Sequence, residues 1–164
     1  MRRIMIAGTN SGCGKTTVTC AVLQALVNRK INVSSFKCGP DYIDPMFHKT
    51  VIGTAAYNLD TYLMSNDAVN YLLNKNSGDI AVIEGVMGFY DGFSFTEKGS
   101  THELSEITDT DVILVVNCRG MSLSAMALVK DLRSLGKIIL KVLYLIICPR
   151  KCTVIWRRNV EKSA

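Results

Sequence analysis

The residues from Gly8 to Thr17 combine glycines with a lysine and hydroxyls, at a spacing typical of a phosphate-binding loop. The glycines allow backbone N–H groups to turn toward phosphate oxygens. Lys15 would supply a positive charge to the β- and γ-phosphates, and the Thr16 hydroxyl can ligate Mg²⁺. Five residues separate Gly8 from Gly14, where the strict pattern has four. The segment predicts a nucleotide-binding loop, with a simple glycine-rich turn as the alternative. The residues expected to contact the nucleotide are Thr9, Asn10, Ser11, Gly12, Cys13, Gly14, Lys15, Thr16 and Thr17.

A second polar segment follows the apolar run that ends at Phe36. Lys37 stands at the expected end of a strand, where a cation can meet a phosphate or a substrate carboxylate. Asp41 and Asp44 lie between two prolines that restrict the backbone. The two aspartates are candidate Mg²⁺ ligands, and turn formation is an equal alternative.

A third polar segment begins at Glu84, directly after the apolar run Ile80–Ile83. An acid at this place in a P-loop enzyme usually reaches Mg²⁺, directly or through water. Asp91, which stands among glycines, is a candidate for metal or substrate binding, with a tight turn as its equal rival. The candidate metal ligands are therefore Thr16, Asp41 and Glu84, with Asp44 beside them.

Alternating strand and helix patterns position these segments. Short runs rich in Val and Ile predict buried strands at 3–7, 31–36, 80–83 and 112–116. Helices are expected at 15–29, 66–75, 103–108 and 122–134, with Ser65 or Asn66 and Ser122 as N-caps. This alternation predicts an α/β fold, a P-loop NTPase-like parallel sheet with helices on both faces. Ligands bind beyond the carboxyl ends of such strands, in the loops 8–16, 37–45, 84–92 and 117–121.

The 164-residue chain has the length of one domain, and its composition is 48% hydrophobic and 20% charged. Neither a signal peptide nor a membrane span is evident in the sequence. The six cysteines are scattered singly, which favours reduced thiols, so we expect a cytoplasmic location. Residues 1–136 hold 12 Lys and Arg against 13 acids, whereas residues 137–164 hold 7 against one. Since the positive charge belongs to the tail alone, we expect neither nucleic acid nor membrane as a partner.

Four motifs carry a resemblance over about residues 1–135. These are the loop 8–17, the segment Phe36–Pro45, the triplet Asn58–Asp60 and the segment Glu84–Gly92. Together they resemble the amino-terminal half of cobyrinic acid a,c-diamide synthases, within a broader group that includes dethiobiotin synthetase. The resemblance implies a domain at 1–136 that binds ATP and Mg²⁺, followed by an atypical basic tail at 137–164.

The resemblance implies an ATP-dependent amidation in cobalamin synthesis. ATP would phosphorylate the c and then the a acetate carboxylate of cobyrinate, and ammonia would attack the acyl phosphate. The catalytic residues would include Lys15 and Lys37, because the developing negative charge needs these cations and Mg²⁺ around it. They would also include Asp41, Asp44 and Glu84, which would organise Mg²⁺ and the reacting carboxylate. Tyr42, Ile43 and Asp91 would face the substrate. The role of Asn58–Asp60 stays open, with a helix cap as the alternative.

The chain departs from the family after Gly136. Family members continue into a glutaminase domain that supplies ammonia from glutamine, and neither His48 nor His102 can stand for its catalytic pair. The charge shift at 137 favours a truncated or frame-shifted product, and a genuine short variant with a fifth strand and a basic helix is the rival. Other readings are a dethiobiotin-synthetase-like ligase, a partitioning-ATPase-like switch and an inactive fragment. Exposed apolar surface would favour self-association, with a homodimer as one form.

Overall fold

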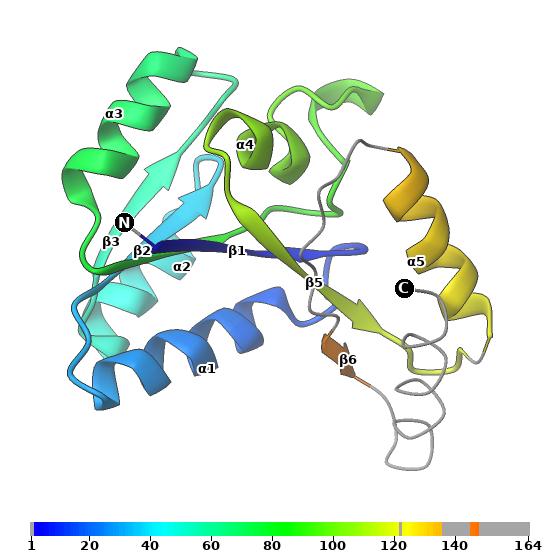
Figure 1. Cartoon of the computed structure of the whole chain (residues 1–164), viewed down its shortest axis with the longest axis horizontal. Helices are drawn as coiled ribbons and strands as arrows, with labels where there is room; N and C mark the ends of the chain where they lie inside the picture. The colour runs from blue at the N-terminus through cyan, green and yellow to red at the C-terminus, as the bar shows by residue number, and fades with distance from the viewer. Residues whose placement is uncertain (1, 122, 136–144, 148–164) are drawn as a thin grey trace.

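The computed structural model describes residues 2–121, 123–135 and 145–147, and these form one parallel sheet with helices packed on both faces (Figure 1). The six strands lie in the order β3-β2-β4-β1-β5-β6 and every recorded pairing is parallel. Their bounds are β1 Arg2–Gly8, β2 Val33–Cys38, β3 Ala55–Leu59, β4 Ile80–Glu84, β5 Asp111–Asn117 and β6 Leu145–Ile147. The expected P-loop NTPase-like α/β fold is confirmed.

The helices divide between the two faces of the sheet. Helix α1 (Lys15–Asn28) covers one face together with η1 (His48–Ile52), a short π-helical segment that continues α2 (Ile43–Phe47). The helices α3 (Asn66–Asn76), α4 (Thr101–Ile107) and α5 (Ser124–Leu135) cover the other face. A short 3₁₀ turn, η2 (Phe93–Phe95), precedes α4.

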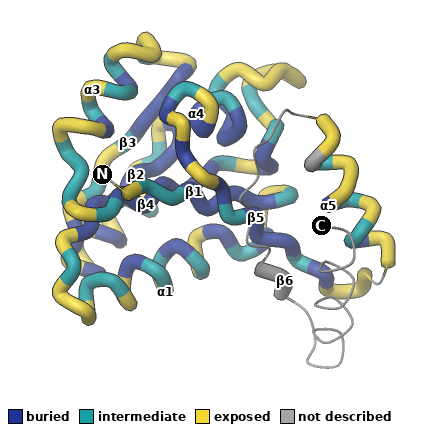
Figure 2. The backbone as a smooth tube through the Cα atoms, in the orientation of Figure 1, coloured by how far each residue is buried: buried dark blue, intermediate teal, exposed yellow. Residues whose placement is uncertain are grey.

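The hydrophobic core follows the period-two alternation of the strands. In β1, Met5 and Ala7 pack toward α3, α4 and α5, whereas Ile6 packs toward α1. In β4, Ile83 and Val82 divide between the same two clusters. Figure 2 shows these central strands in the dark blue of buried residues and the outer surfaces of the helices in yellow. Burial on both faces explains why these strands are continuous apolar runs in the sequence.

Most elements lie where the sequence predicts them, with two omissions. Strands β1, β4 and β5 match within one or two residues, and β2 begins two residues later than expected. The Ser65 hydroxyl caps α3 by accepting a hydrogen bond from the Ala68 N–H, as expected. Strand β3 and the α2–η1 segment were not predicted. Strand β3 lacks a continuous apolar run, because it lies at the sheet edge with alternating burial and contains Asn58. The expected cap Ser122 lies outside the described residues.

The tail expected at 137–164 contributes one described element. Strand β6 pairs with β5, with Val115 opposite Leu145 and Asn117 opposite Ile147. The remainder of the tail lies outside the described residues. Within the part of the chain that the structure describes, no helix is long and apolar enough to cross a bilayer.

Strand register brings the polar segments to one edge of the sheet. Lys37 on β2 is the register partner of Glu84 on β4, and Glu84 is also the partner of Ile6 on β1. Because parallel strands all point the same way, their carboxyl ends share one edge. The loop that follows β1 therefore lies beside the ends of β4 and β5.

Candidate functional site

The glycine-rich loop connects β1 to α1 and leaves the amino terminus of that helix open. Gly12 and Gly14 adopt positive φ angles of 74° and 106°, a region that residues with a Cβ rarely enter. Helix α1 begins after Gly14 with no side-chain cap and no acidic residue in its first turn. Its first N–H groups therefore have no competing side-chain acceptor, which is the arrangement that suits an anion.

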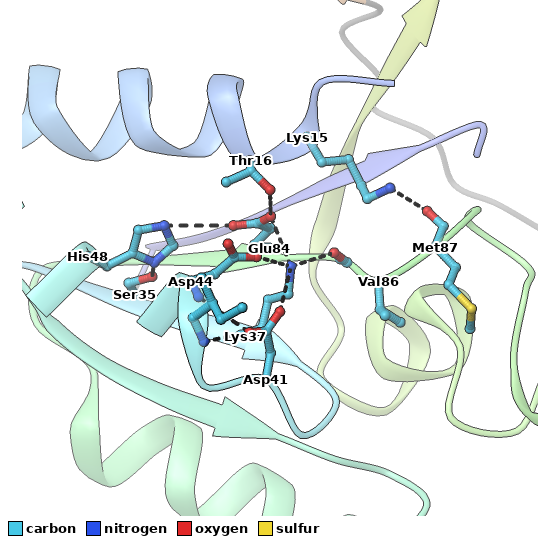
Figure 3. Close-up of polar contacts among 12 residues, drawn as sticks. Lys15, Thr16, Ser35, Lys37, Asp41, Asp44, His48, Glu84, Val86 and Met87 are labelled. Atoms are coloured by element: carbon cyan, nitrogen blue, oxygen red, sulfur yellow. Dashed lines mark hydrogen bonds and ion pairs between the residues drawn. The ribbon is translucent and has the colours of Figure 1, made fainter. Parts of the chain in front are cut away.

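Lys15 lies between the glycine-rich loop and the loop after β4. Its ammonium donates to the carbonyl oxygen of Asn10 at 3.0 Å. It also donates to the carbonyl oxygen of Met87 (Figure 3). The side chain is largely buried, and this burial lowers the pKa of Lys15 below the usual lysine value. The ammonium also lies 4.0 Å from Cys13 Sγ, and a buried cation that pairs with no carboxylate among the described residues is well placed to bind a phosphate.

Glu84 joins the glycine-rich loop to the segment after β2. The Thr16 hydroxyl donates to Glu84 Oε1 at 2.6 Å, and the Lys37 ammonium donates to the same oxygen at 2.9 Å (Figure 3). Glu84 is fully buried. Burial raises the pKa of Glu84, and the donors Lys37 and Thr16 partly offset that rise.

Lys37 is surrounded by three carboxylates. Its ammonium lies 2.6 Å from Asp44 Oδ2, 2.9 Å from Glu84 Oε1 and 3.7 Å from Asp41 Oδ2. Burial would lower the pKa of Lys37, but Glu84 and Asp44 raise it above the usual lysine value. Three carboxylates around one ammonium leave an excess of negative charge, which favours the approach of a cation.

Asp41 also shapes the backbone, as the alternative sequence interpretation proposed. Its Oδ1 accepts hydrogen bonds from the N–H groups of Ile43 and Asp44, at 2.9 and 3.3 Å, where α2 begins. Asn58 holds the same turn by donating from Nδ2 to the Asp41 carbonyl at 2.8 Å. In the same triplet, Asp60 Oδ1 accepts from the N–H groups of Tyr62 and Leu63, so its role is a turn cap.

The side chains expected to face the substrate are not part of this buried cluster. Tyr42 and Ile43 are 83% and 74% exposed at the start of α2, beside the exposed Met46. Asp91 Oδ2 accepts a hydrogen bond from the Gly88 N–H at 3.0 Å, and its own N–H donates to the Gly88 carbonyl. Asp91 thus forms the tight turn that was the rival interpretation of this residue.

The side chains fit a magnesium ion with few protein ligands. Thr16 Oγ1 and Glu84 Oε1 are adjacent, and Glu84 Oε2 has no hydrogen-bond partner. Among the described residues, no group of three or more His, Cys, Asp or Glu side chains is arranged to hold a metal. Mg²⁺ keeps several waters and binds through one or two carboxylates plus substrate phosphates, so the pair Thr16 and Glu84 suits it.

Two buried residues of the site were not predicted. His48 is fully buried at the start of η1, with Nδ1 2.8 Å from Ser35 Oγ and Nε2 3.7 Å from Glu84 Oε2. A signal for His48 was present, because it follows Asp44 by four residues and would share a helix face with it. Ser35 carried no such signal, because it stands in an unbroken buried strand.

Comparison with known families matches residues 4–148 to CbiA, described as the CobQ/CobB/MinD/ParA nucleotide binding domain. Curated relatives include a cobyrinate a,c-diamide synthase of Thermoplasma volcanium, 49% identical over 80% of this chain and 29% of the relative. The enzyme of the same name from Priestia megaterium is 47% identical over 79% of this chain and 29% of its own. The chain thus spans less than a third of the length of these relatives.

Solved structures with the same fold are more distant in sequence. The signal recognition particle receptor FtsY of Elizabethkingia anophelis superposes with a TM-score of 0.60 at 14% identity, over 88% of this chain and 49% of its own. The hydrogenase maturation factor HypB of Archaeoglobus fulgidus gives a TM-score of 0.52 at 14% identity, over 99% of this chain and 89% of its own. At such identity the likeness concerns the fold alone.

Proposed function

The chain belongs to the CobQ/CobB/MinD/ParA nucleotide-binding family, and from that membership we propose that it is the ATP-binding part of a cobyrinate a,c-diamide synthase. The proposed reaction is the ATP- and Mg²⁺-dependent amidation of the c and then the a acetate carboxylate of cobyrinate. The observation that carries the proposal is the cluster around Lys37, which joins three carboxylates to the glycine-rich loop through Thr16. Residues 1–136 would form the ATP-binding part, followed by the basic tail.

The first proposed step is phosphoryl transfer to a substrate carboxylate. A carboxylate oxygen attacks the γ-phosphorus of ATP, the bond to the β-phosphate oxygen breaks, and ADP leaves. The open amino terminus of α1 and Lys15 would hold the phosphates. Mg²⁺, held by Thr16 and Glu84 with Asp41 nearby, would neutralise charge on the phosphate oxygens.

The second proposed step is attack of ammonia on the acyl phosphate. The nitrogen bonds to the acyl carbon, the carbon–oxygen bond breaks, and inorganic phosphate leaves with that electron pair and takes up the proton that the nitrogen loses. Lys37 would bind the substrate carboxylate and then stabilise the phosphate as it departs. Asp41 and Asp44 would hold Lys37 in place, while Tyr42, Ile43 and Asp91 would face the corrin. Ammonia would come from glutamine, through a glutaminase unit.

Calorimetric titration of ATP with Mg²⁺ into the purified chain tests the nucleotide site. We expect binding by the unchanged chain, loss of binding in Lys15→Ala, and unchanged binding in Lys130→Ala, which alters an exposed lysine of α5. Ammonia-dependent ADP release that also requires cobyrinate would then support the amidation. Absence of ATP binding by the unchanged chain would contradict the proposal. ADP release at the same rate with and without cobyrinate would contradict cobyrinate as the substrate.

A further inference from the structure

Two buried polar atoms without hydrogen-bond partners face each other at the site. Of the side-chain atoms that the structure describes, four buried ones have no hydrogen-bond partner: Thr19 Oγ1, His48 Nε2, Asn58 Oδ1 and Glu84 Oε2. His48 Nε2 and Glu84 Oε2 are 3.7 Å apart, and both side chains are fully buried (Figure 3). A buried polar group without a partner loses its hydration and gains no hydrogen bond in exchange, so it destabilises the folded state. A shift of about 0.8 Å would bring the two atoms to a normal hydrogen-bond distance of about 2.9 Å and satisfy both.

The hydrogen bond to Ser35 decides which ring nitrogen of His48 carries the proton. If the Ser35 hydroxyl donates to Nδ1, the proton is on Nε2 and points at the carboxylate. If Nδ1 donates to Ser35 instead, an Nε2 lone pair faces Glu84 Oε2. That second arrangement is tolerable only when Glu84 is protonated.

The other partners of Glu84 favour the first arrangement. Lys37 and Thr16 both donate to Oε1, at 2.9 and 2.6 Å, which leaves Oε2 as the buried oxygen that still needs a donor. A neutral imidazole carries a single N–H, and Nδ1 already faces the Ser35 hydroxyl. One proton on Nε2 then satisfies Ser35, His48 and Glu84 together.

We propose that His48, held as its Nε2–H tautomer by the Ser35 hydroxyl, is a positioning residue that fixes Glu84 Oε2 and so presents Glu84 Oε1 to Thr16 and to a bound Mg²⁺. The same logic applies where an outer histidine or carboxylate orients a metal ligand. The metal part of this inference rests on the proposed function. The tautomer and the contact with Glu84 do not rest on it.

NMR of the ¹⁵N-labelled unchanged chain tests the tautomer without any ligand. The chain has two histidines, so a His102→Gln variant assigns both ring spectra. At about pH 8, well above the ~6.5 of an unperturbed imidazole, we expect His48 to carry its proton on Nε2. A proton on Nδ1 would overturn the proposal, because Glu84 would then be the group that donates.

Metal dependence tests the positioning role. In His48→Gln the amide nitrogen stands near the place of Nε2, whereas in His48→Asn it stands near Nδ1 and cannot reach Glu84. We expect His48→Asn to weaken the apparent Mg²⁺ affinity in the presence of ATP by about 10–100-fold, the usual effect of losing an outer-shell partner. His48→Gln should recover most of this loss, and ATP binding measured in EDTA should be the same in all three proteins.

The two experiments separate this inference from the proposed function. Equal Mg²⁺ affinity in His48→Asn and the unchanged chain would overturn the positioning role. An equal loss of ATP binding in EDTA would indicate general damage and would also count against it. If the unchanged chain binds no ATP, the proposed function fails, while the NMR spectrum still decides the arrangement of Ser35, His48 and Glu84.

Discussion

Lys37 Nζ lies 2.9 Å from Glu84 Oε1, although the two residues are 47 positions apart in the chain. They meet because β2 and β4 are neighbouring parallel strands in which Lys37 and Glu84 are direct register partners. Both side chains are buried, with exposed fractions of 7% and 0%. The ion pair therefore ties the second polar segment to the third at the edge of the sheet where the glycine-rich loop begins.

Lys37→Met should destabilise the chain, because it leaves Glu84 buried without its counter-ion. Breaking one partner of a buried ion pair costs about 3–5 kcal/mol. Urea unfolding at neutral pH measures the loss, and Lys130→Met, at an exposed position of α5, should change the free energy of unfolding by less than about 0.5 kcal/mol. The double variant Lys37→Met/Glu84→Gln should recover part of the stability. A loss no larger than that of the control would show that the pair contributes nothing.

Asp44 should contribute stability that disappears in acid. Burial would raise its pKa, but the hydrogen bond and charge of Lys37 lower the pKa below the ordinary carboxyl value. A carboxylate with a lower pKa in the folded state stabilises fully above its unfolded pKa of about 3.9, and the contribution is lost as pH falls through the folded value.

The comparison of Asp44→Asn with the unchanged chain measures this contribution. The difference in unfolding free energy should be present at pH 6–7 and should shrink as the pH falls below about 4. Asp67→Asn, which alters an exposed acid in the first turn of α3, is the matched control. A difference that stays constant across this range would rule out the charge as its source.

Gly8→Ala should disrupt the nucleotide loop. A Cβ at this position would lie 2.9 Å from Lys15 Cγ and closer still to Cys13 Sγ. The contact with sulfur is the tighter one, so Gly8→Ala/Cys13→Ala should recover part of the ATP affinity lost in the single variant. Calorimetric titration with Mg²⁺ and ATP measures the ATP affinity of the single and of the double variant. Equal affinities for the single and double variants would show that sulfur is not the obstacle.

The exposed apolar side chains in α2 and just before it should promote self-association of the isolated chain. Tyr42, Ile43 and Met46 lie together in sequence and are each more than half exposed. Ile43→Asp should shift the population toward monomer, because a charge in a shared apolar contact loses its hydration when the contact forms. Light scattering over a wide concentration range measures the share of monomer in the unchanged chain and in the variant. A stable monomer in the unchanged chain would refute the expectation, and Leu123→Asp, at an exposed position before α5, is the control.

The sequence by itself determined the fold class and which loops carry the candidate site residues. Buried parallel strands are continuous apolar runs, and the Gly8–Thr17 spacing marks a loop whose chemistry depends on local backbone geometry. Those signals lie within a few neighbouring residues, so they can be read without the fold. The edge strand β3 and the short α2–η1 segment were not predicted, because their apolar patterns are weak and tertiary contacts determine their conformation.

Only the tertiary structure decided which polar residues act together. The sequence placed Asp41, Asp44 and Glu84 as candidate ligands, but the register of β2 and β4 placed Lys37 among all three. It also assigned Asp91 to a turn and brought Ser35 and His48 beneath Glu84. Such groupings join segments far apart in the chain. They depend on strand order and on helix packing against the sheet, which no local pattern of residues encodes.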